Sequence, residues 1–429
     1  MAEPIAKLSP WTDQTARDAL RHLFDVAVAS ADPARVLAQH LPRKPQGRCI
    51  VVGAGKAAAS MAAAVDAAWP DVDLSGIVVV PYGYGMPAGR IMVREAAHPV
   101  PDTASEAAAR EILAAVAGLR PEDLVLVLIS GGGSSVMALP APGITLADKQ
   151  KVSRLLLASG LDIRTMNVVR RRLSAIKGGK LLAAAHPARV VTLGISDIPG
   201  DDMAAIASGP SIPDPTADMD LRHVVALLGD QLPAAVSARL LTVERAILSS
   251  GDHDACLIGT PAAALDAAAD AARALGLHPI LLGDDLEGES QALGQEMAAL
   301  VRRGVPTPTV LLSGGETTVT LAGKTPGRGG RNTEFALALA CSIEGLPGVW
   351  ALAGDTDGED GASKAAGALI APDTIDRCAA IGLDAHTYLA AHDSGTLFAT
   401  IGDLLVTGPT CTNVNDFRAV LVLPSEDHA

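Results

Sequence analysis

Short apolar runs alternate with amphipathic segments along the first half of the chain. The runs are rich in Val, Leu and Ile, whereas the segments between them repeat apolar residues at helical spacing. The pattern predicts strands at residues 48–52, 76–81, 124–129 and 189–195. It predicts helices at residues 12–39, 56–68 and 103–117, and three more between 146 and 185. Such alternation is typical of a parallel sheet with helices on both faces.

The second half of the chain departs from this simple alternation. A stretch rich in Pro, Gly and Asp runs up to residue 218 and predicts a long ordered loop. Helical periodicity returns at 220–248, and the runs at 254–258, 261–275 and 279–282 predict a strand–helix–strand unit, which is followed by a helix at 287–303. We therefore expect an α/β fold with an N-terminal domain at 1–245 and a C-terminal domain at 306–429. Residues 246–305 connect them, and their assignment to either domain is open.

Glycine-rich turns with hydroxyls or charges follow several of the apolar runs. Such turns offer backbone N–H groups to anions at the start of helices, so several in one chain indicate a protein that holds phosphates. The turns are Gly53-Ala54-Gly55-Lys56, Ser130-Gly131-Gly132-Gly133-Ser134-Ser135, Ser313-Gly314-Gly315-Glu316-Thr317, Gly329-Gly330-Arg331-Asn332 and Gly354-Asp355-Thr356-Asp357-Gly358.

The first two turns each have a functional and a structural interpretation. Residues 53–58 match the G-x-G-x-x-A pattern of dinucleotide-binding folds. The strand at 77–80 lacks the following acidic residue that would hold a ribose, and Lys56 suits a more highly charged phosphate or a carboxylate. The alternative is a surface lysine. Gly131 to Gly133 allow a ligand close to the backbone and Ser134 can cap the next helix, or the glycines simply permit a tight turn.

Charged and amide side chains near the other turns could perform the chemistry. Asp197 directly follows a strand, where a carboxylate could bind Mg²⁺ or accept a hydroxyl proton. Asp355 or Asp357 could hold Mg²⁺ on a phosphate. Arg331 could clamp a carboxylate or phosphate at two points. Asn415 lies in a polar stretch and either contacts a ligand or satisfies backbone groups.

Composition excludes several classes of function. The 429 residues carry a formal net charge of −14, which argues against general nucleic-acid binding. The run Arg170-Arg171-Arg172 is interpreted as a solvated helix face or helix end. Five scattered cysteines, no signal-like N-terminus and no apolar run of about 18–20 residues predict a cytoplasmic protein without a membrane span. Walker A and protein-kinase signatures are absent from the sequence.

Taken together, the motifs resemble one known family. The chain from about Thr15 to Leu423 is similar to the glycerate 2-kinases with a MOFRL C-terminal domain, some of which carry the older label "putative hydroxypyruvate reductase". Besides the turns above, the matching segments are Asn167-Val168-Val169-Arg170, Leu173-Ser174-Ala175-Ile176-Lys177-Gly178-Gly179-Lys180-Leu181, Ser196-Asp197-Ile198-Pro199-Gly200-Asp201, Ala207-Ser208-Gly209-Pro210 and Thr407-Gly408-Pro409-Thr410.

This resemblance implies a Rossmann-like αβα domain, a MOFRL-type α/β domain and a cleft between them. It implies transfer of the γ-phosphoryl group of ATP to the 2-hydroxyl of D-glycerate, with Mg²⁺. Lys56 and Arg331 match the family's positive charges, and Asp197, Glu316, Asp355 and Asn415 match its polar positions. We accordingly expect Lys56, Arg331 and Asp197 to be catalytic and Asp355 and Asp357 to hold the metal. The residues expected to bind substrate or nucleotide are Gly53, Gly55, Ser130, Gly131, Gly132, Gly133, Ser134, Ser135, Glu316 and Asn415.

Two other functions stay open on the sequence. One is an NAD(P)H-dependent hydroxypyruvate reductase, and the other is a non-catalytic module that binds a phosphorylated metabolite. A homodimer is also open.

Overall fold

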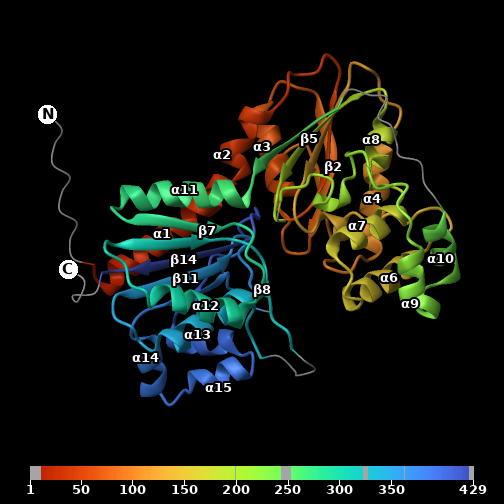
Figure 1. Ribbon diagram of the computed structural model, residues 1–429. Coiled ribbons are helices and arrows are strands. Elements are labelled where there is room, and N and C mark those ends of the chain that lie inside the picture. The colour runs from red at the N-terminus through yellow and green to blue at the C-terminus, as the bar shows by residue number, and fades with distance from the viewer. Residues whose placement is uncertain (1–10, 199, 243–252, 322–326, 362, 425–429) are drawn as a thin grey trace. The chain divides into compact units, whose positions relative to one another are not determined.

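The computed structural model describes residues 11–198, 200–242, 253–321, 327–361 and 363–424. They fold into two compact units (Figure 1). The N-terminal unit holds the described parts of Ala31–Thr260 together with Cys411–Asn413. The C-terminal unit holds those of Met1–Ser30, Pro261–Thr410 and Val414–Ala429.

A six-stranded sheet forms the centre of the N-terminal unit, in the order β3-β2-β1-β4-β5-β6. Each neighbouring pair is parallel, which confirms the predicted parallel sheet. The strand order reverses between β1 and β4, and ligands of open α/β sheets bind at the carboxyl ends of the strands at such a point. The strands are β1 (Cys49–Ala54), β2 (Leu74–Pro81), β3 (Met92–Ala96), β4 (Leu124–Ile129), β5 (Arg189–Ile195) and β6 (His253–Gly259).

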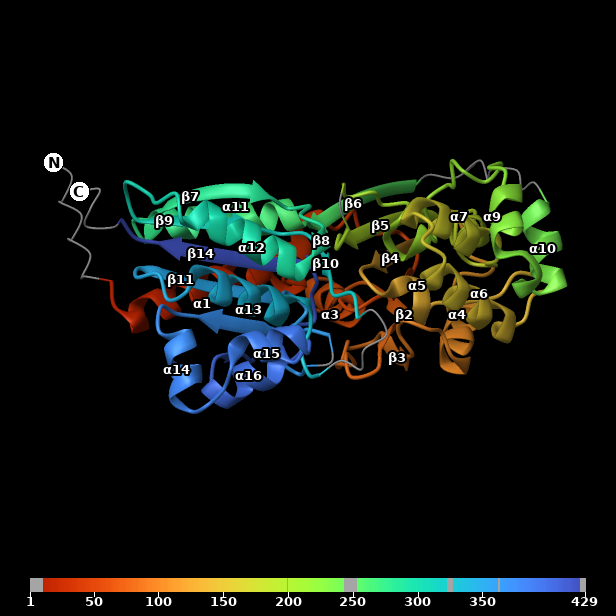
Figure 2. The ribbon, with the colours of Figure 1, turned by 60° about the horizontal axis from the view of Figure 1, so that its bottom comes forward.

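Helices cover both faces of this sheet. On one face α4 (Thr103–Ala115), α5 (Gly133–Val136) and α8 (Lys180–Ala185) pack on alternate residues of the strands. On the other face lie α2 (Pro33–Val36) and α3 (Ala58–Ala68). A separate helical cluster with its own apolar core lies on the side of α4 in both ribbon views (Figures 1 and 2). It consists of α6 (Leu146–Ala158), α7 (Ile163–Arg172), α9 (Arg222–Leu228) and α10 (Ala234–Leu241).

The C-terminal unit is built on a mixed six-stranded sheet, in the order β13-β12-β11-β14-β9-β7. Only β7 and β9 pair in parallel among the described strands of this sheet. The strands are β7 (His278–Gly283), β9 (Thr309–Ser313), β11 (Val349–Asp355), β12 (Gly367–Ile370), β13 (Leu404–Leu405) and β14 (Asp416–Val422). Two short strands, β8 (Gly288–Glu289) and β10 (Thr317–Thr318), pair separately.

Two layers of helices enclose this second sheet (Figure 1). On one face α1 (Asp13–Ser30) packs beside α11 (Pro261–Ala274). On the other face α12 (Ser290–Val301) packs beside α13 (Arg331–Ile343), and α14 (Thr374–Ala380), α15 (Ala385–Ala390) and α16 (Ser394–Ile401) contact α13 from outside. The described residues thus form an α/β protein of two units, each built on a six-stranded sheet, and the α/β class is as expected.

The structure corrects two predictions about the elements. The helix expected over 12–39 ends at Ser30, and a new short helix starts at Pro33 with the Asp32 side chain as its cap. Proline at the first helical position is typical of such a restart. The strand–helix–strand unit predicted at 254–282 does not form, because β6 and β7 belong to different sheets. Residues 243–248 of the predicted helix at 220–248 lie outside the described residues.

The two units also divide the chain differently from the expected domains. The first helix, α1, packs in the C-terminal unit: Phe24 meets Phe417 edge to face, with ring centroids 6.0 Å apart, and Trp350 Nε1 donates to Asp13 at 2.8 Å. An amphipathic pattern reveals the apolar face of a helix, but not which sheet will cover that face. Within the described residues, no helix has the length and apolar character needed to span a membrane.

Candidate functional site

The first two predicted glycines bring the end of β1 close to β4. A Cβ on Gly53 would lie 2.2 Å from the carbonyl oxygen of Leu128. Gly55 has a φ of +126°, and a Cβ there would lie 2.4 Å from the oxygens of Ser130. Because only glycine allows this approach, the pattern at residues 53–58 has a packing explanation.

The backbone N–H groups of this turn are used inside the protein. Gly55 N donates to the carbonyl of Val79 at 3.0 Å, and Lys56 N donates to the carbonyl of Gly131 at 2.8 Å. Ala57 N donates to Ser130 Oγ at 2.9 Å. A dinucleotide-binding fold needs these groups for the pyrophosphate. The expectation of a free N–H cradle at the start of α3 is therefore wrong.

The Ser130–Ser135 loop is different. None of the hydrogen bonds found between described residues uses the N–H of Gly131, Gly132 or Ser134. Ser134 is not the helix cap that we expected, because Gly132, at φ +77°, occupies the N-cap position of α5. Instead, Ser134 Oγ and Ser208 Oγ share a hydrogen bond of 2.6 Å. The Ser130–Ser135 loop can therefore offer backbone N–H groups to an anion, whereas the N–H groups of Gly55, Lys56 and Ala57 are already used.

Lys56 and Asp197 both approach this loop. A Cβ on Gly132 would lie 3.7 Å from Lys56 Cγ, and one on Gly131 would lie 1.7 Å from Asp197 Oδ2. Asn413 Nδ2 donates to this same carboxylate oxygen at 3.0 Å. The glycines therefore make room for a cation and a carboxylate at the point where the strand order reverses.

The loop after β5 adopts an unusual backbone beside these groups. Asp201, Ala207 and Ser208 all have positive φ values, of 55°, 51° and 59°. Such conformations cost energy in residues other than glycine and cluster at functional sites. Ser208 is fully buried, and its carbonyl accepts from Gly178 N at 3.2 Å. The predicted long loop thus contributes a strained segment next to Ser134.

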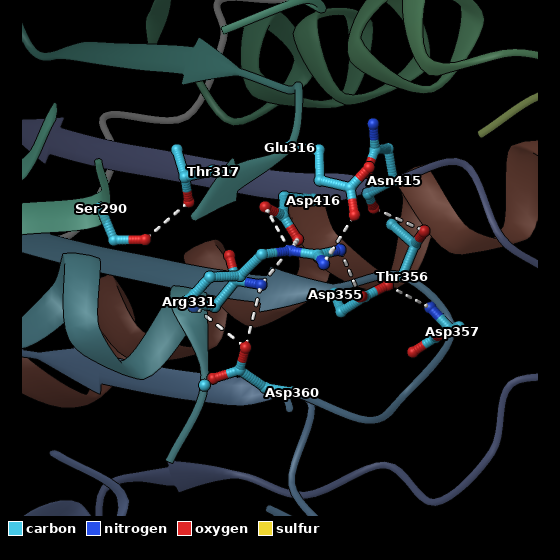
Figure 3. A network of polar contacts seen from close by, with 12 residues as sticks. Ser290, Glu316, Thr317, Arg331, Asp355, Thr356, Asp357, Asp360, Asn415 and Asp416 are labelled. Carbon is cyan, nitrogen blue, oxygen red and sulfur yellow. Dashed lines mark hydrogen bonds and ion pairs between the residues drawn. The ribbon is translucent and has the colours of Figure 1, made fainter. Parts of the chain in front are cut away.

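In the C-terminal unit, Arg331 begins α13 and binds three carboxylates (Figure 3). Its Nε donates to the two oxygens of Asp416 at 2.8 and 3.0 Å. One terminal nitrogen donates to Glu316 at 2.9 Å and the other to Asp355 at 2.8 Å. Burial acts to lower the pKa of Arg331, but the three carboxylates outweigh it and hold the pKa above its usual value. Arg331 therefore remains charged.

Strand register explains why these carboxylates meet. The antiparallel pairing of β11 with β14 places Asp355 opposite Asp416. Like charges directly opposite each other are unfavourable, so a cation must lie between them. Arg331 bridges the two, and the fully buried Arg418 donates to Asp416 at 2.6 Å.

The Asp360 carboxylate accepts hydrogen bonds from the first turn of α13. Its oxygens accept from Asn332 N at 3.0 Å, from Thr333 N at 2.9 Å and from Thr333 Oγ1 at 3.0 Å. Burial raises the pKa of Asp360 to about 6, with a further contribution from the nearby Asp416. Despite its donors, this carboxyl group is thus costly to ionise.

The predicted metal ligands lie on one turn after β11. Asp357 N donates to Asp355 Oδ1 at 3.1 Å, and the carbonyl of Asn415, a residue with φ +71°, accepts from Thr356 Oγ1 at 2.7 Å. Across the described ranges, no group of three or more His, Cys, Asp or Glu residues could hold a metal ion. Any metal here would rely on one or two carboxylates and on oxygens from outside the protein.

Comparison with known proteins places this geometry in a family. A domain of unknown function (DUF4147) matches residues 19–241, and the MOFRL family matches residues 309–416. A glycerate 2-kinase of Pyrococcus horikoshii is 36% identical over 424 residues, which cover 95% of this chain and 94% of that protein. The chain belongs to the DUF4147/MOFRL glycerate kinase family.

Other members of this glycerate kinase family carry two different names. A protein of Agrobacterium vitis named "Putative hydroxypyruvate reductase" is 54% identical over 427 residues, covering 96% of each chain. The crystal structure of a glycerate kinase from Thermotoga maritima matches with a TM-score of 0.86 and 34% identity, covering 96% of this chain and all of that one. These matches establish the family and the fold.

The predicted residues of this family member fall into two groups. Gly53, Gly55, Lys56, Ser130 to Ser135 and Asp197 lie together in the N-terminal unit, and Glu316, Arg331, Asp355, Asp357 and Asn415 lie together in the C-terminal unit. Sequence reasoning missed Asn413 as the partner of Asp197 and Asp416 as the main partner of Arg331. Their signal was the polar stretch 410–416, in which we singled out only Asn415.

Proposed function

We propose that this protein is a glycerate 2-kinase, which transfers the γ-phosphoryl group of ATP to the 2-hydroxyl of D-glycerate. The observation that carries the proposal is that Lys56 and Asp197 both lie against the Gly131–Gly132 backbone. Phosphoryl transfer needs a cation for the phosphate charge and an acceptor for the hydroxyl proton. The family membership supports both glycerate and ATP as substrates.

In the proposed reaction Asp197 takes the proton of the 2-hydroxyl group. The hydroxyl oxygen then forms a bond to the γ-phosphorus, while the bond from that phosphorus to the β–γ bridging oxygen breaks. ADP leaves with the electron pair, and Lys56 offsets negative charge on the transferred group. Asn413 keeps the Asp197 carboxylate in place through its hydrogen bond of 3.0 Å.

The proposal includes Mg²⁺, held by Asp355 and Asp357. Carboxylate oxygens are suitable ligands, and Mg²⁺ commonly takes only one or two of them and fills its other positions with water and phosphate oxygens. When bound, the ion would neutralise phosphate charge. Arg331 fixes the Asp355 carboxylate through its bond of 2.8 Å and so supports the ligand.

A hydroxypyruvate reductase is the second candidate, because some relatives carry that name. Against it stands the β1–α3 turn, whose Gly55, Lys56 and Ala57 N–H groups are already bound to protein acceptors. A nicotinamide dinucleotide would have to bind without the contact that defines its fold.

Phosphorus NMR of a reaction with ATP, Mg²⁺ and D-glycerate tests the proposal. We expect 2-phosphoglycerate and ADP, with no product when the metal is chelated. The 2-hydroxyl lies nearer the carboxylate than the 3-hydroxyl, so an enzyme that holds the carboxylate reaches it first. Formation of 3-phosphoglycerate alone would leave a kinase of different regiochemistry. Loss of nicotinamide absorbance with hydroxypyruvate, without ATP turnover, would overturn the proposal, and binding without any turnover would indicate a metabolite-binding module.

A further inference from the structure

A lysine that the proposed reaction does not use contacts the Ser130–Ser135 loop. Lys177 lies between α7 and α8, and only 2% of its surface is exposed. Its Nζ donates to the carbonyl oxygen of Ser134. Lys177 is thus fixed to the loop that carries the unused N–H groups of Gly131, Gly132 and Ser134.

Two more basic residues, Lys149 and Arg170, act electrostatically on Lys177. Lys149 of α6 is buried, and its Nζ donates to the carbonyl of Leu173 at 3.2 Å. Arg170 of α7 is partly buried and donates to Asn167 Oδ1 at 3.1 Å. All of these acceptors are neutral groups. Within the part of the chain that the structure describes, neither Lys149, Arg170 nor Lys177 forms an ion pair with a carboxylate.

The neighbouring Arg171, by contrast, does have a carboxylate partner. Arg171 is equally buried, and its Nε lies 3.0 Å from the carboxylate of Asp214. A buried charge without a partner of opposite sign is costly. Burial, followed by repulsion from Lys180 and Arg170, lowers the pKa of Lys149 to about 7. Burial, followed by repulsion from Lys149 and Arg170, lowers the pKa of Lys177 well below its usual value.

We propose that Lys177, Arg170 and Lys149, together with the Gly131–Ser134 backbone, form a phosphate-binding subsite of the N-terminal unit. The N–H groups of the loop would bind the phosphate oxygens, and the buried cations would supply the opposite charge. The run Arg170–Arg172, which the sequence suggested to be a solvated helix face or end, would then contribute one of these cations.

A phosphate group fits this subsite better than a carboxylate does. Several N–H donors and more than one cation suit a group with three oxygens and close to two negative charges. The inference rests on the proposed function for the source of the phosphate, which is either the nucleotide or the phosphorylated three-carbon acid. The chemistry of recognition is the same for both.

A purely structural role is the competing explanation. Lys149 and Lys180 both donate to carbonyls at the end of α7, the oxygens of Leu173 and Arg171, at 3.2 and 3.0 Å. Cations often bind such carbonyls at helix C-termini. If Lys177 likewise only holds Ser134, its removal should destabilise the protein and leave anion binding intact.

Isothermal titration calorimetry of the full chain distinguishes the two explanations. The variants are Lys177→Met and Arg170→Met, and the control is Lys151→Met, which removes an exposed lysine from α6. Inorganic tripolyphosphate is the first probe, and ADP, 2-phosphoglycerate and D-glycerate follow. We expect both variants to bind tripolyphosphate about tenfold or more weakly, since each loses one of the positive charges that offset the charge of the phosphate. The control should stay within about twofold.

The arms of this experiment identify the source of the phosphate. A loss of ADP affinity assigns the subsite to the nucleotide, whereas a loss of 2-phosphoglycerate affinity assigns it to the product, and D-glycerate affinity should change little. If Lys177→Met does not fold, Arg170→Met and Lys177→Arg decide. Absence of tripolyphosphate binding to the wild type, or unchanged affinity in the folded variants, would overturn the subsite. These outcomes do not depend on turnover, so a failed kinase assay with intact Lys177-dependent binding would refute only the proposed function.

Discussion

The surroundings of the glycine-rich turns have opposite electrostatic character in the two units, although the same kind of turn predicted a site in each. In the N-terminal unit, Lys149, Arg170 and Lys177 are buried or partly buried near a glycine loop without a carboxylate partner among the described residues. In the C-terminal unit, one cation, Arg331, has three carboxylates around it. A glycine turn with a cation nearby therefore does not by itself indicate an anion site. The balance of charges around the cation decides what it can bind.

This comparison changes the expected role of Arg331. Its Nε and both terminal nitrogens already bind carboxylates, so a phosphate or substrate carboxylate has to share these donors or displace Glu316. Glu316 is the half-exposed partner, with 50% of its side chain accessible. Arg331 is thus first of all the group that lets Asp355 and Asp416 lie side by side.

The largest effect should follow from Arg331→Met. Without the guanidinium, the buried Asp355 and Asp416 would repel each other across the β11–β14 pair. We expect the free energy of unfolding of the C-terminal unit to fall by about 3 kcal/mol, because breaking a buried charge pair costs 3–5 kcal/mol and Arg331 is 25% exposed. Urea unfolding measures this, together with a loss of kinase activity. Arg331→Lys should keep more stability but little activity, since lysine cannot make the two-point contact.

The control for this variant is Arg328→Met, an exposed arginine three residues away. It should change neither stability nor activity. If Arg331→Met unfolded at the same urea concentration as the wild type, Arg331 would not be needed to hold Asp355 and Asp416 together. The electrostatic difference between the two units would then not be supported.

Lys56→Ala should act on the reaction and not on the fold. Its backbone N–H holds the carbonyl of Gly131 and survives the substitution. Losing a charge that meets the phosphate typically costs several kcal/mol, so we expect kcat/KM to fall about 100-fold or more. Steady-state kinetics and circular dichroism check the two halves of this prediction, with Lys151→Ala as the exposed control. A near-normal kcat/KM would return Lys56 to the role of a surface lysine.

Asp197→Asn should lower kcat more than it changes the KM for glycerate. The amide keeps the shape of the side chain beside Gly131 but cannot accept the hydroxyl proton. The expected loss in kcat is about 100-fold or more, the usual contribution of a general base. Asp202→Asn, in the same loop, serves as the control. An unchanged kcat of Asp197→Asn at every pH would transfer the role of proton acceptor to Asp355 or Asp357.

Local features of the sequence were sufficient to predict much of the N-terminal unit. Short apolar runs followed by glycine-rich turns define β1 and β4. Parallel strands bring their carboxyl ends to one edge, so Lys56 and the Ser130–Ser135 loop could be expected together. The use of the turn N–H groups could not be foreseen, because the acceptors Val79 and Gly131 come from other strands and loops.

Features set by long-range pairing could not be predicted from the sequence. Asp355 meets Asp416 only through the register of β11 on β14, and α1 covers a sheet whose strands begin more than two hundred residues later. The burial of the two lysines could not be predicted for another reason. Lysine is almost always exposed, so Lys149 and Lys177 gave no sign of burial until the helices around them were in place.

The smallest predicted effect concerns Asp360. It tests whether this buried carboxyl group of the C-terminal unit is protonated near pH 5. Its pKa is raised from 3.8 to about 6 by burial and by Asp416, so the folded protein favours the protonated form. The stability that this protonation contributes is fully present below the unfolded pKa and is lost as the pH rises through about 6. Linkage gives a loss of about 1 kcal/mol between pH 5 and pH 7.

The measurement is the free energy of urea unfolding at pH 5, 6 and 7 for the wild type and for Asp360→Asn. Asparagine offers a single acceptor oxygen to the N–H groups of Asn332 and Thr333, so the variant should be less stable throughout, and only the change with pH is compared. Other titrating groups affect both proteins alike, so the difference between them should shrink as the pH rises. A difference that stays constant from pH 5 to pH 7 would mean that Asp360 is ionised throughout this range, and that the positive charges of Arg331 and Arg418 reach further into the C-terminal unit than the bonds to Asp416 indicate.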